Sequence, residues 1–299
     1  MYDLIIIGGG IAGFSAAMYA KRYELKILLI SELDGGTITK THLVENYPGF
    51  TSLSGYELAQ NIINHAKAFN VKTISATVNK IEKNNNNFII STKNNENYQS
   101  KTVIWATGTE YRKLGLESEK KLTNKGVSYC ATCDGFFFKD KIVGVVGGSD
   151  SAVKEALLLC KYASQVYIIY RGEQVHPEPI NLKRMQENSK IKVINEVNIT
   201  EVLGTEKVTG IKLDSGEIIN LEGLFIEIGR IPNTTLLESL EISLNKKKEV
   251  IINKKTETNL PGFFAAGDVT DTEFKQAIIS AAEGSQAANS AFEYLSKNF

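Results

Sequence analysis

Blocks of apolar residues separated by glycine-rich turns run through the chain and predict parallel strands covered by helices. Leu4–Ile7 is an uninterrupted apolar run, as expected of a strand that is buried on both faces. It leads into the turn Gly8–Gly13, then into a helix-like segment that ends near Tyr23, and then into a second apolar run at Ile27–Ile30. Strand, glycine turn, helix and strand in this order predict a βαβ unit.

A second unit of the same kind begins near the middle of the chain. Its strands, turn and helix are predicted at Ile142–Val146, Gly147–Ala152, Val153–Tyr162 and Val166–Tyr170. The two units align without a gap, pairing Gly8 with Gly147, Gly13 with Ala152, Ile30 with Ile169 and Glu32 with Arg171. Two such units predict the α/β class, with two Rossmann-like three-layer domains.

The first glycine turn matches the pattern that binds the pyrophosphate of a dinucleotide. Gly8 makes the tight turn, Gly10 lets the backbone approach the pyrophosphate, and Gly13 lets the helix pack on the strand. The helix N-terminus adds partial positive charge for the phosphates. Glu32 follows the second strand and accepts hydrogen bonds from free ribose hydroxyls, so the first unit is predicted to bind FAD.

The second glycine turn departs from this pattern at two positions. Arg171 stands where the first unit has Glu32, and a guanidinium suits the 2′-phosphate of NADPH. Ser149 stands where the first unit has Gly10, and its Cβ crowds a pyrophosphate. The second unit is therefore predicted to bind NADPH at a less well fitted site.

Three further segments complete the predicted elements. Val71–Ser100 alternates and contains two asparagine-rich turns, which predicts a short antiparallel meander. Thr102–Gly108 and Leu260–Val269 are apolar strands that each end in small residues and deliver a glycine to one edge of the sheet. Phe274–Tyr294 is helix-like, and its N-terminus is expected to point at an electron-rich ring edge.

Composition and charge exclude several classes of protein. The chain of 299 residues has 34 basic and 34 acidic side chains, so no overall field favours nucleic acid or an anionic membrane. It enters a strand directly after Met1, without a basic leader, and no apolar run reaches the ~18 residues of a membrane helix. A soluble cytoplasmic protein is expected.

The candidate chemistry lies in the segment Cys130-Ala131-Thr132-Cys133-Asp134. Two thiols two residues apart can cycle between dithiol and disulfide, and the adjoining acid Asp134 can carry the proton that the leaving thiolate requires. Half of a zinc site has the same pattern, but zinc needs a second pair of ligands. The remaining cysteine and the histidines stand alone, so no metal is predicted; these residues are Cys160, His42, His65 and His176.

Taken together, these motifs resemble the low-molecular-weight thioredoxin reductases, class II pyridine nucleotide-disulfide oxidoreductases, over nearly the whole chain. The residues that carry the resemblance are Gly8–Gly13, Gly35–Thr37, Val44–Gly49, Ala106–Gly108, Cys130–Gly135, Gly229–Thr234, Ala265–Val269 and Lys275–Ala277. The resemblance implies a homodimer whose FAD domain is discontinuous, with the second domain inserted in the first. The implied boundaries are 1–112 and 245–299 for the FAD domain and 113–244 for the inserted NAD(P) domain.

The resemblance also implies roles for individual residues. Cys130 attacks the disulfide of a thioredoxin or glutaredoxin-like protein, Cys133 faces the flavin, and Asp134 is the acid and base. The inserted domain swings between two poses about hinges near Lys113–Leu116 and near Leu244. The predicted FAD residues are Gly8, Gly10, Ile11, Ala12, Gly13, Ser31, Glu32, Gly35, Gly36, Thr37, Asn46, Ala106, Thr107, Gly108, Gly267, Asp268, Lys275, Gln276 and Ala277; the predicted NAD(P) residues are Gly147, Gly148, Ser149, Asp150, Ser151, Tyr170, Arg171 and His176.

The electron donor stays open because the chain departs from the family at the second site. Relatives that use NADPH carry His-Arg-Arg-x-x-x-Arg where this chain has Tyr170–His176, which keeps one arginine and adds Glu173. NADPH is the default donor, with NADH, ferredoxin or deazaflavin as alternatives. A non-catalytic flavin redox sensor is a second interpretation, whereas a flavin reductase that serves ferredoxin would not need Cys130 and Cys133.

Overall fold

The computed structural model describes all 299 residues, which form two compact units. Unit 1 contains Met1–Glu110 and Ile231–Phe299, and unit 2 contains Tyr111–Arg230. The first division lies close to the predicted boundary after Arg112. The second lies earlier than the predicted boundary after Leu244, because Leu237, Leu240 and Ile242 are buried in a core of unit 1.

Unit 1 is built on a seven-stranded sheet of order β3-β2-β1-β6-β5-β4, with β17 beside β6. Its strands are β1 (Tyr2–Ile7), β2 (Ile27–Ser31), β3 (Thr73–Ser75), β4 (Val78–Asn84), β5 (Asn87–Thr92), β6 (Asn97–Trp105) and β17 (Phe263–Ala265). Its helices are α1 (Ile11–Arg22), η1 (Gly36–Lys40), α2 (Gly55–Ala68), η3 (Thr235–Leu240) and α7 (Ala277–Asn298). The strands β1, β2, β3, β6 and β17 run parallel, and β4, β5 and β6 form the predicted antiparallel meander.

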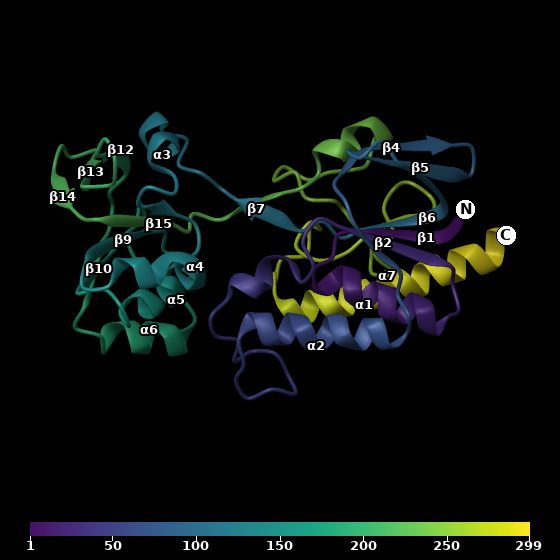
Figure 1. Cartoon of the computed structure of the whole chain (residues 1–299), viewed down its shortest axis with the longest axis horizontal. Helices are drawn as coiled ribbons and strands as arrows, with labels where there is room; N and C mark the ends of the chain where they lie inside the picture. The colour runs from purple at the N-terminus through teal and green to yellow at the C-terminus, as the bar shows by residue number, and fades with distance from the viewer. The chain divides into compact units, whose positions relative to one another are not determined.

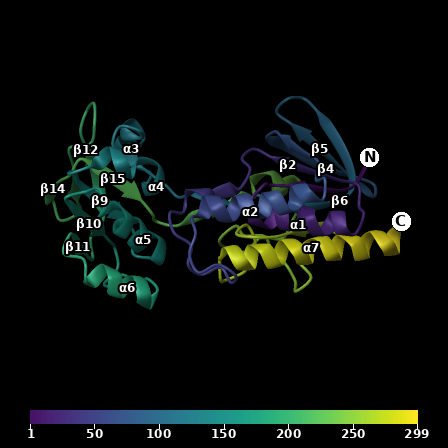
Figure 2. The ribbon, with the colours of Figure 1, turned by 60° about the horizontal axis from the view of Figure 1, so that its bottom comes forward.

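The parallel strands of unit 1 are apolar on both faces because helices and loops cover both. In Figures 1 and 2, α1, α2 and α7 lie together on one side of the sheet, and α1 and α7 share a core with the sheet residues Leu4, Ile6 and Ile104. The opposite face packs against η3 and the meander, with Ile5 and Phe263 among its fully buried residues. Burial of this kind stabilises by about 25 cal/mol per Å² of apolar surface, so it dominates the fold of the unit.

Unit 2 repeats the architecture on a smaller scale. A parallel sheet of order β11-β10-β9-β15-β8 lies beside an antiparallel sheet of order β12-β13-β14. The strands are β8 (Val127–Ser128), β9 (Ile142–Val146), β10 (Gln165–Ile169), β11 (Ile191–Ile194), β12 (Ile199–Leu203), β13 (Gly210–Leu213), β14 (Ile218–Asn220) and β15 (Gly223–Ile226). The helices are α3 (Glu117–Leu122), α4 (Ala131–Asp134), η2 (Gly135–Phe138), α5 (Asp150–Leu159) and α6 (Pro179–Gln186).

The parallel sheet of unit 2 is also covered on both faces. One core joins it to α5 and α6, and it includes Cys160, whose side chain packs among apolar residues as predicted. A second core joins its other face to α3 and to the antiparallel sheet. Figure 1 shows these layers, with α5 and α6 on one side of the sheet and β12–β14 with α3 on the other. The predicted α/β fold class with Rossmann-like three-layer units is confirmed.

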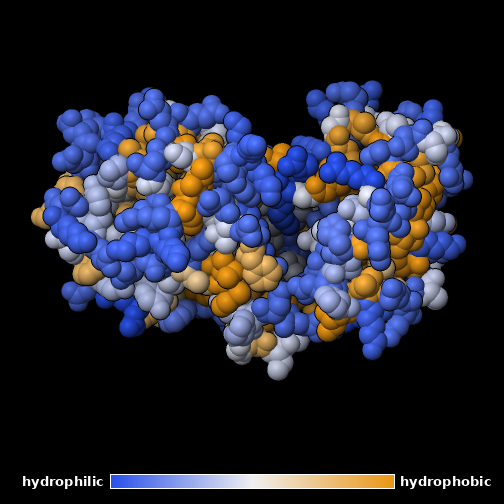
Figure 3. Space-filling model, turned by 180° about the vertical axis from the view of Figure 1, so that it is seen from behind, coloured by the Kyte–Doolittle hydropathy of each residue, from blue (hydrophilic) through white to orange (hydrophobic).

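The chain passes between the units twice, through β7 (Thr109–Tyr111) and β16 (Arg230–Pro232), which pair as a two-stranded sheet. On the face shown in Figure 3, hydrophobic residues gather in separate groups among hydrophilic ones. Among the helices, not one combines the length and the apolar character needed to span a bilayer.

Candidate active site

Cys130 and Cys133 form a disulfide at the start of α4, with their Cα atoms 5.4 Å apart. Strand β8 ends at Ser128 and delivers the pair to the edge of the unit 2 sheet. The two sulfurs have different surroundings, because Cys133 is exposed whereas Cys130 is only 7% exposed. Cys130 also caps the helix, since its Sγ accepts the backbone N–H of Cys133 at 3.2 Å. The pair is therefore a dithiol couple with one accessible and one sheltered sulfur.

The predicted acid Asp134 is held by a serine that the sequence did not reveal. Ser128 donates its hydroxyl to Asp134 Oδ2 at 2.6 Å, and its Oγ accepts the backbone N–H of Cys130 at 3.1 Å. One hydroxyl thus links the carboxylate to the first cysteine. Ser128 lies on β8, two residues before Cys130. The contact with Asp134 depends on the direction in which the Ser128 side chain leaves the strand, which the spacing in the sequence does not give.

Tyr129 precedes the disulfide and is anchored on its other side. Its hydroxyl donates to Glu119 Oε1 at 2.7 Å, and burial together with this carboxylate raises the pKa of Tyr129 to about 12. Glu119 is 2% exposed and accepts the backbone N–H groups of Leu114, Gly115 and Leu116. The predicted hinge segment before α3 is therefore tied through Glu119 to the residue next to Cys130.

Two exposed aromatic side chains follow the disulfide. Phe136 and Phe137 in η2 are 69% and 68% exposed, and Phe136 makes an edge contact with Tyr162 at a ring separation of 6.2 Å. Large exposed aromatics next to a reactive group are typical of a surface that binds another protein. Sequence reasoning missed them, although the Phe-Phe pair directly after Gly135 was visible in the chain.

The first glycine turn lies in unit 1, between β1 and α1, and it forms an open cradle. Gly8 has φ +113°, a conformation that side chains avoid, and a Cβ there would collide with the carbonyl of Ala106. A Cβ on Gly13 would collide with the carbonyl of Gly8, so helix and strand approach closely. By contrast, a Cβ on Gly10 meets nothing within 4 Å. The space in front of Gly10 is free for a ligand.

No side chain competes with a ligand at the start of α1. Its N-cap, Gly10, makes no side-chain hydrogen bond, and no acidic residue lies in its first turn. The free N–H groups of Ile11 and its neighbours are therefore available to an anion, and the carboxylate nearest the turn is Asp34, whose Oδ1 would lie 3.2 Å from a Cβ on Gly9. In addition, Ser31 Oγ is buried and has no hydrogen-bond partner within the protein. A dinucleotide with an anionic pyrophosphate fits this donor set.

The other predicted FAD residues of unit 1 converge on this turn. Gly35 donates its N–H to Gly9 O at 2.7 Å, and a Cβ on Gly36 would lie 3.0 Å from Gly10 Cα. Ala106 follows β6 and donates to Ile7 O at 2.8 Å. A Cβ on Gly267 would lie 3.0 Å from Ala12 Cβ, which places the segment after β17 against the start of α1. The residues that follow these contact points are Thr37, Thr107, Gly108 and Asp268.

Asn46 joins the start of α7, where its Nδ2 donates to Gln276 Oε1 at 3.0 Å. Helix α7 begins at Ala277 without a side-chain cap or an acid in its first turn, so its N–H groups also remain available. Lys275 is instead engaged within the protein, with Nζ 3.0 Å from Glu249 Oε1. Glu32 is exposed at the end of β2, as a residue that reads a ribose should be.

The second glycine turn lies in unit 2 between β9 and α5, and its cradle is occupied. Ser149 is the N-cap of α5, and Asp150 puts a carboxylate into the first turn. Asp150 Oδ1 is fixed by the N–H of Glu178 at 2.9 Å and by Nδ2 of Asn181 at 2.8 Å. An acid fixed at this position repels the phosphates that the same turn attracts in unit 1.

A ring and a loop cover the rest of the second turn. The Tyr170 ring lies where a Cβ on Gly148 would project, and the N–H of His176 donates to Gly148 O at 2.7 Å. Tyr170 Oη and His176 Nδ1 are 3.4 Å apart. Arg171 is exposed, and Ser151 is exposed in the first turn of α5. Of the predicted NAD(P) residues, Gly148, Tyr170 and His176 contact one another across the turn, which fits a pyrophosphate less well.

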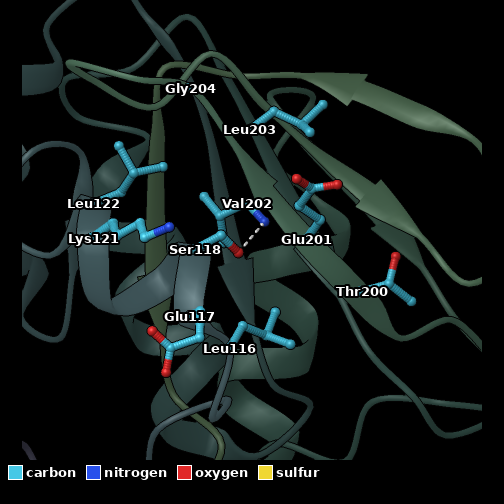
Figure 4. A pocket seen from close by; sticks show the side chains of 10 residues that line it. All are labelled: Leu116, Glu117, Ser118, Lys121, Leu122, Thr200, Glu201, Val202, Leu203 and Gly204. Atoms are coloured by element: carbon cyan, nitrogen blue, oxygen red, sulfur yellow. Dashed lines mark hydrogen bonds between the residues drawn. The ribbon is translucent and has the colours of Figure 1, made fainter.

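A hollow of about 400 Å³ in unit 2 lies between α3 and β12 and contains none of the predicted site residues. Figure 4 shows Ser118 at its centre, where the hydroxyl accepts the N–H of Val202 at 3.0 Å and so covers the edge of β12. Its lining mixes Glu117, Lys121 and Glu201 with aliphatic side chains. No group of three or more His, Cys, Asp or Glu side chains is arranged to hold a metal ion.

Comparison with known proteins decides the family. The family model of the pyridine nucleotide-disulphide oxidoreductases matches residues 2–284. The chain belongs to this family. Within it, the chain is 40% identical over 315 residues to the thioredoxin reductase of Buchnera aphidicola, covering all of this chain and 96% of that protein. The predicted membership of the thioredoxin reductase group is confirmed.

Two further relatives place the likeness in context. The structure of Lactococcus lactis thioredoxin reductase in its FR conformation superposes with a TM-score of 0.95 at 34% identity, covering 99% of this chain and 100% of that one. A component of the alkyl hydroperoxide reductase of Staphylococcus epidermidis is 35% identical over 303 residues. That match takes in 99% of this chain but only 60% of the longer protein.

Proposed function

We propose that the chain is an FAD-dependent disulfide reductase that passes electrons to its Cys130–Cys133 pair and then to the disulfide of thioredoxin or a thioredoxin-like protein. The observation that carries the proposal is the pairing of an open dinucleotide cradle in unit 1 with an accessible disulfide in unit 2. Family membership supports both halves.

FAD fits unit 1 because the turn offers donors and space where a pyrophosphate needs them. Gly10 leaves room for the phosphates, Glu32 is placed for the ribose, and Ser31 Oγ lacks a partner that a ligand can supply. The N–H groups at the start of α7 are placed to stabilise negative charge. When bound, FAD supplies two electrons for the disulfide.

The chain's own residues then carry out a thiol–disulfide exchange. Two electrons and two protons convert the Cys130–Cys133 disulfide into two thiols. One thiolate attacks a sulfur of the partner's disulfide, which forms a mixed disulfide and releases a partner thiolate. The second thiol of the pair displaces the partner, which leaves as a dithiol while the Cys130–Cys133 bond forms again. Asp134, held by Ser128, is placed to give a proton to the leaving thiolate and to take one from the resolving thiol.

The test is reduction of thioredoxin by the purified holoenzyme with NADPH, NADH, reduced ferredoxin or reduced deazaflavin offered separately. We expect turnover with at least one donor and loss of turnover in Cys133→Ser and in Cys130→Ser. Cys160→Ser is the matched control, because Cys160 lies outside the disulfide in the core of unit 2, and burial raises the pKa of its thiol to about 11. Thioredoxin reduction that persists in Cys133→Ser would refute the proposal.

Trapping assigns the roles of the two sulfurs. With the predicted roles, Cys133→Ser holds a mixed disulfide with the partner through Cys130, and Cys130→Ser does not. This experiment is informative because Cys133 is the exposed cysteine of the oxidised pair. Exposure alone favours Cys133, and not Cys130, as the cysteine that attacks the partner's disulfide. Phe136 and Phe137 are proposed as the surface on which the partner docks.

The electron donor is the second part of the proposal. The surroundings of the second glycine turn favour weak binding of NADPH or NADH. NADPH remains the default, as expected for the family. The acid Asp150, the ring of Tyr170 and Ser149 in place of a glycine each act against a bound pyrophosphate. Failure of NADPH and NADH to bleach the flavin while reduced ferredoxin or deazaflavin does so would assign the alternative donor.

The predicted homodimer and cytoplasmic location belong to the same proposal. Light scattering of the purified holoenzyme tests the dimer.

The non-catalytic sensor is the competing interpretation, and it gains if no donor reduces bound FAD while a partner binds only one redox form. The functional division into an FAD domain at 1–112 and 245–299 and an inserted domain at 113–244 is likewise proposed.

A further inference from the structure

A group of charged side chains lies behind the Cys130–Cys133 segment, and the proposed function leaves it without a role. Glu155, in the middle of α5, accepts the N–H of Ala131 through Oε2 at 2.5 Å. Glu227 follows β15 and is 7% exposed. The guanidinium of Arg230 lies 4.3 Å from the ring centre of Tyr111, and its Nη1 is buried without a hydrogen-bond partner. Glu155 lies on α5, Arg230 lies on β16, and Glu227 directly follows β15.

Glu155 is half-buried and Glu227 is buried, and Arg230 is the cation that acts on both. Burial raises the pKa of Glu155 to about 7, against the lowering effects of the Ala131 N–H and Arg230. Burial also raises the pKa of Glu227 to about 8; the charge of Glu155 adds to the rise and Arg230 opposes it. Near neutral pH the pair therefore gains or loses a proton as a unit.

Glu155 touches the backbone on which the sheltered sulfur is carried. Ala131 is the residue after Cys130, so its N–H is one of the nearest donors to the Cys130 side chain. The N–H of Cys133 faces Cys130 Sγ, whereas that of Ala131 is taken by Glu155. Cys130 is 7% exposed, so water solvates its thiolate poorly and neighbouring groups decide its stability.

We infer that Glu155 is a positioning residue of the dithiol, which holds the Ala131 peptide in place and whose negative charge opposes formation of the Cys130 thiolate. The inference rests on the proposed disulfide exchange for its purpose but not for its test.

The charged groups around Glu155 are few. Lys154, on the same helix, pairs with Asp150 at 3.9 Å, and Asp134 on α4 is held by Ser128. Arg230, on β16, lowers the pKa of Glu155, and the charge of Glu155 raises the pKa of Glu227, which follows β15. With Arg230 as the only cation that opposes it, ionised Glu155 disfavours a second negative charge on the adjacent cysteine.

The test measures the thiol itself in a Cys133→Ser background, where Cys130 is the remaining thiol of the pair. The holoprotein is treated with iodoacetamide at a series of pH values, and mass spectrometry of the Cys130 peptide gives the alkylation rate. Adding Glu155→Gln keeps a hydrogen-bond acceptor for Ala131 and removes the charge. We expect the midpoint of the pH profile to fall by about one unit, which is up to about tenfold faster alkylation at pH 7.

Controls separate charge from loss of structure. Glu222→Gln removes an exposed acid of the same unit and is expected to leave the midpoint unchanged. Glu227→Gln keeps the charge of Glu155, so the midpoint is expected not to fall. If Glu155→Gln fails to fold, Glu155→Asp and Glu227→Gln still bear on the inference, since both keep a charge at position 155 and neither lowers the midpoint.

Two results overturn the inference. One is an unchanged midpoint in Glu155→Gln; the other is faster alkylation at every pH with the same midpoint, which indicates only a loosened segment. No electron donor and no partner protein takes part in the assay. Failure of thioredoxin reduction therefore leaves this result standing, and failure of this result leaves the proposed reductase activity standing.

Discussion

The two glycine turns have the same backbone and different surroundings. In unit 1, Ala106 donates its N–H to Ile7 O at 2.8 Å, and in unit 2 Glu227 donates to Val146 O at the same distance of 2.8 Å. In both units the first glycine of the turn leaves no room for a Cβ beside the carbonyl of that neighbouring residue. The turn between strand and helix therefore has the same backbone arrangement in both units.

What differs is the set of side chains at equivalent positions. At four equivalent positions the first turn has the smaller or the uncharged residue and the second has the larger or the acidic one; the pairs are Ser31 and Tyr170, Ile11 and Asp150, Gly10 and Ser149, Ala106 and Glu227. The first turn is left open to an anionic ligand. The second is partly filled, and the residue that follows its neighbouring strand is the buried acid Glu227. Nucleotide binding thus depends on what the turn leaves uncovered, and not on the turn alone.

The largest effect is expected when a side chain is added to the open space at Gly10, in the first glycine turn. Gly10→Val adds a side chain to free space in an extended backbone conformation, so the protein without ligand keeps its fold. The new methyl groups occupy the space proposed for the pyrophosphate, and we expect FAD affinity to fall on the order of 100-fold. Flavin absorbance after reconstitution measures it. Ser149→Val in the second turn is the matched control and is expected to keep FAD; a Gly10→Val protein that holds FAD normally would break the comparison.

The buried acids of unit 2 predict a dependence of its stability on pH. Glu155 and Glu227 ionise near the usual glutamate pKa of 4.5 when unfolded, but their pKa values are near 7 and 8 when folded. The folded state therefore binds more protons between those values, so its stability is highest below pH 4.5 as far as this pair is concerned. That contribution is lost progressively as pH rises above 4.5, and it is gone once the pH exceeds the folded pKa values of about 7 and 8.

Hydrogen exchange of β9 and β15 peptides at pH 5.5 and pH 8.5, corrected for intrinsic rates, measures the stability of unit 2. Exchange is the suitable probe because the single tryptophan, Trp105, lies in unit 1. Glu227→Gln is expected to flatten the pH dependence. Asp3 and Glu249 have lowered pKa values, so their contributions are lost only in acid, outside this window. A stability that rises between the two pH values in unit 2 would contradict the assignment.

Removing the acid from the second turn is expected to have a smaller effect. Asp150→Asn keeps an oxygen that accepts the hydrogen bonds of Glu178 and Asn181 and removes the charge. We expect NADPH to bind about fivefold more tightly, because the negative charge of Asp150 no longer repels the phosphates at the N-terminus of α5. Isothermal titration against the holoenzyme measures it, with the exposed Asp140→Asn as control. Equal affinity in all three proteins would show that Asp150 does not limit the site.

Most of the fold was predictable because apolar runs and glycine turns are local signals. Both βαβ units, the meander and the final helix lie close to their predicted positions, with α7 beginning at Ala277 where Phe274 was predicted. The second unit boundary was not predictable, since Leu237 and Leu240 join the core of unit 1 through contacts with residues far away in the sequence.

The site was predictable where a motif carries the chemistry and hidden where the fold supplies it. Cys130, Cys133 and Asp134 stand next to one another in the chain, so their partnership could be inferred. Glu155 and Glu227 reach the same region from α5 and β15, and no spacing in the sequence signals that. The contacts that cover the second glycine turn were not predictable for the same reason, because the loop must fold before His176 can donate its N–H to Gly148 O.

The central claim is that electrons entering at bound flavin reach the Cys130–Cys133 disulfide. Anaerobic titration of the FAD-loaded protein with dithionite, followed by flavin absorbance and by counting free thiols, measures it directly. The wild-type protein is predicted to take up about four electrons per chain and Cys133→Ser about two, because flavin and disulfide each hold two. Equal uptake by the two proteins, or wild-type protein whose flavin is reduced while the disulfide stays intact, would contradict the account.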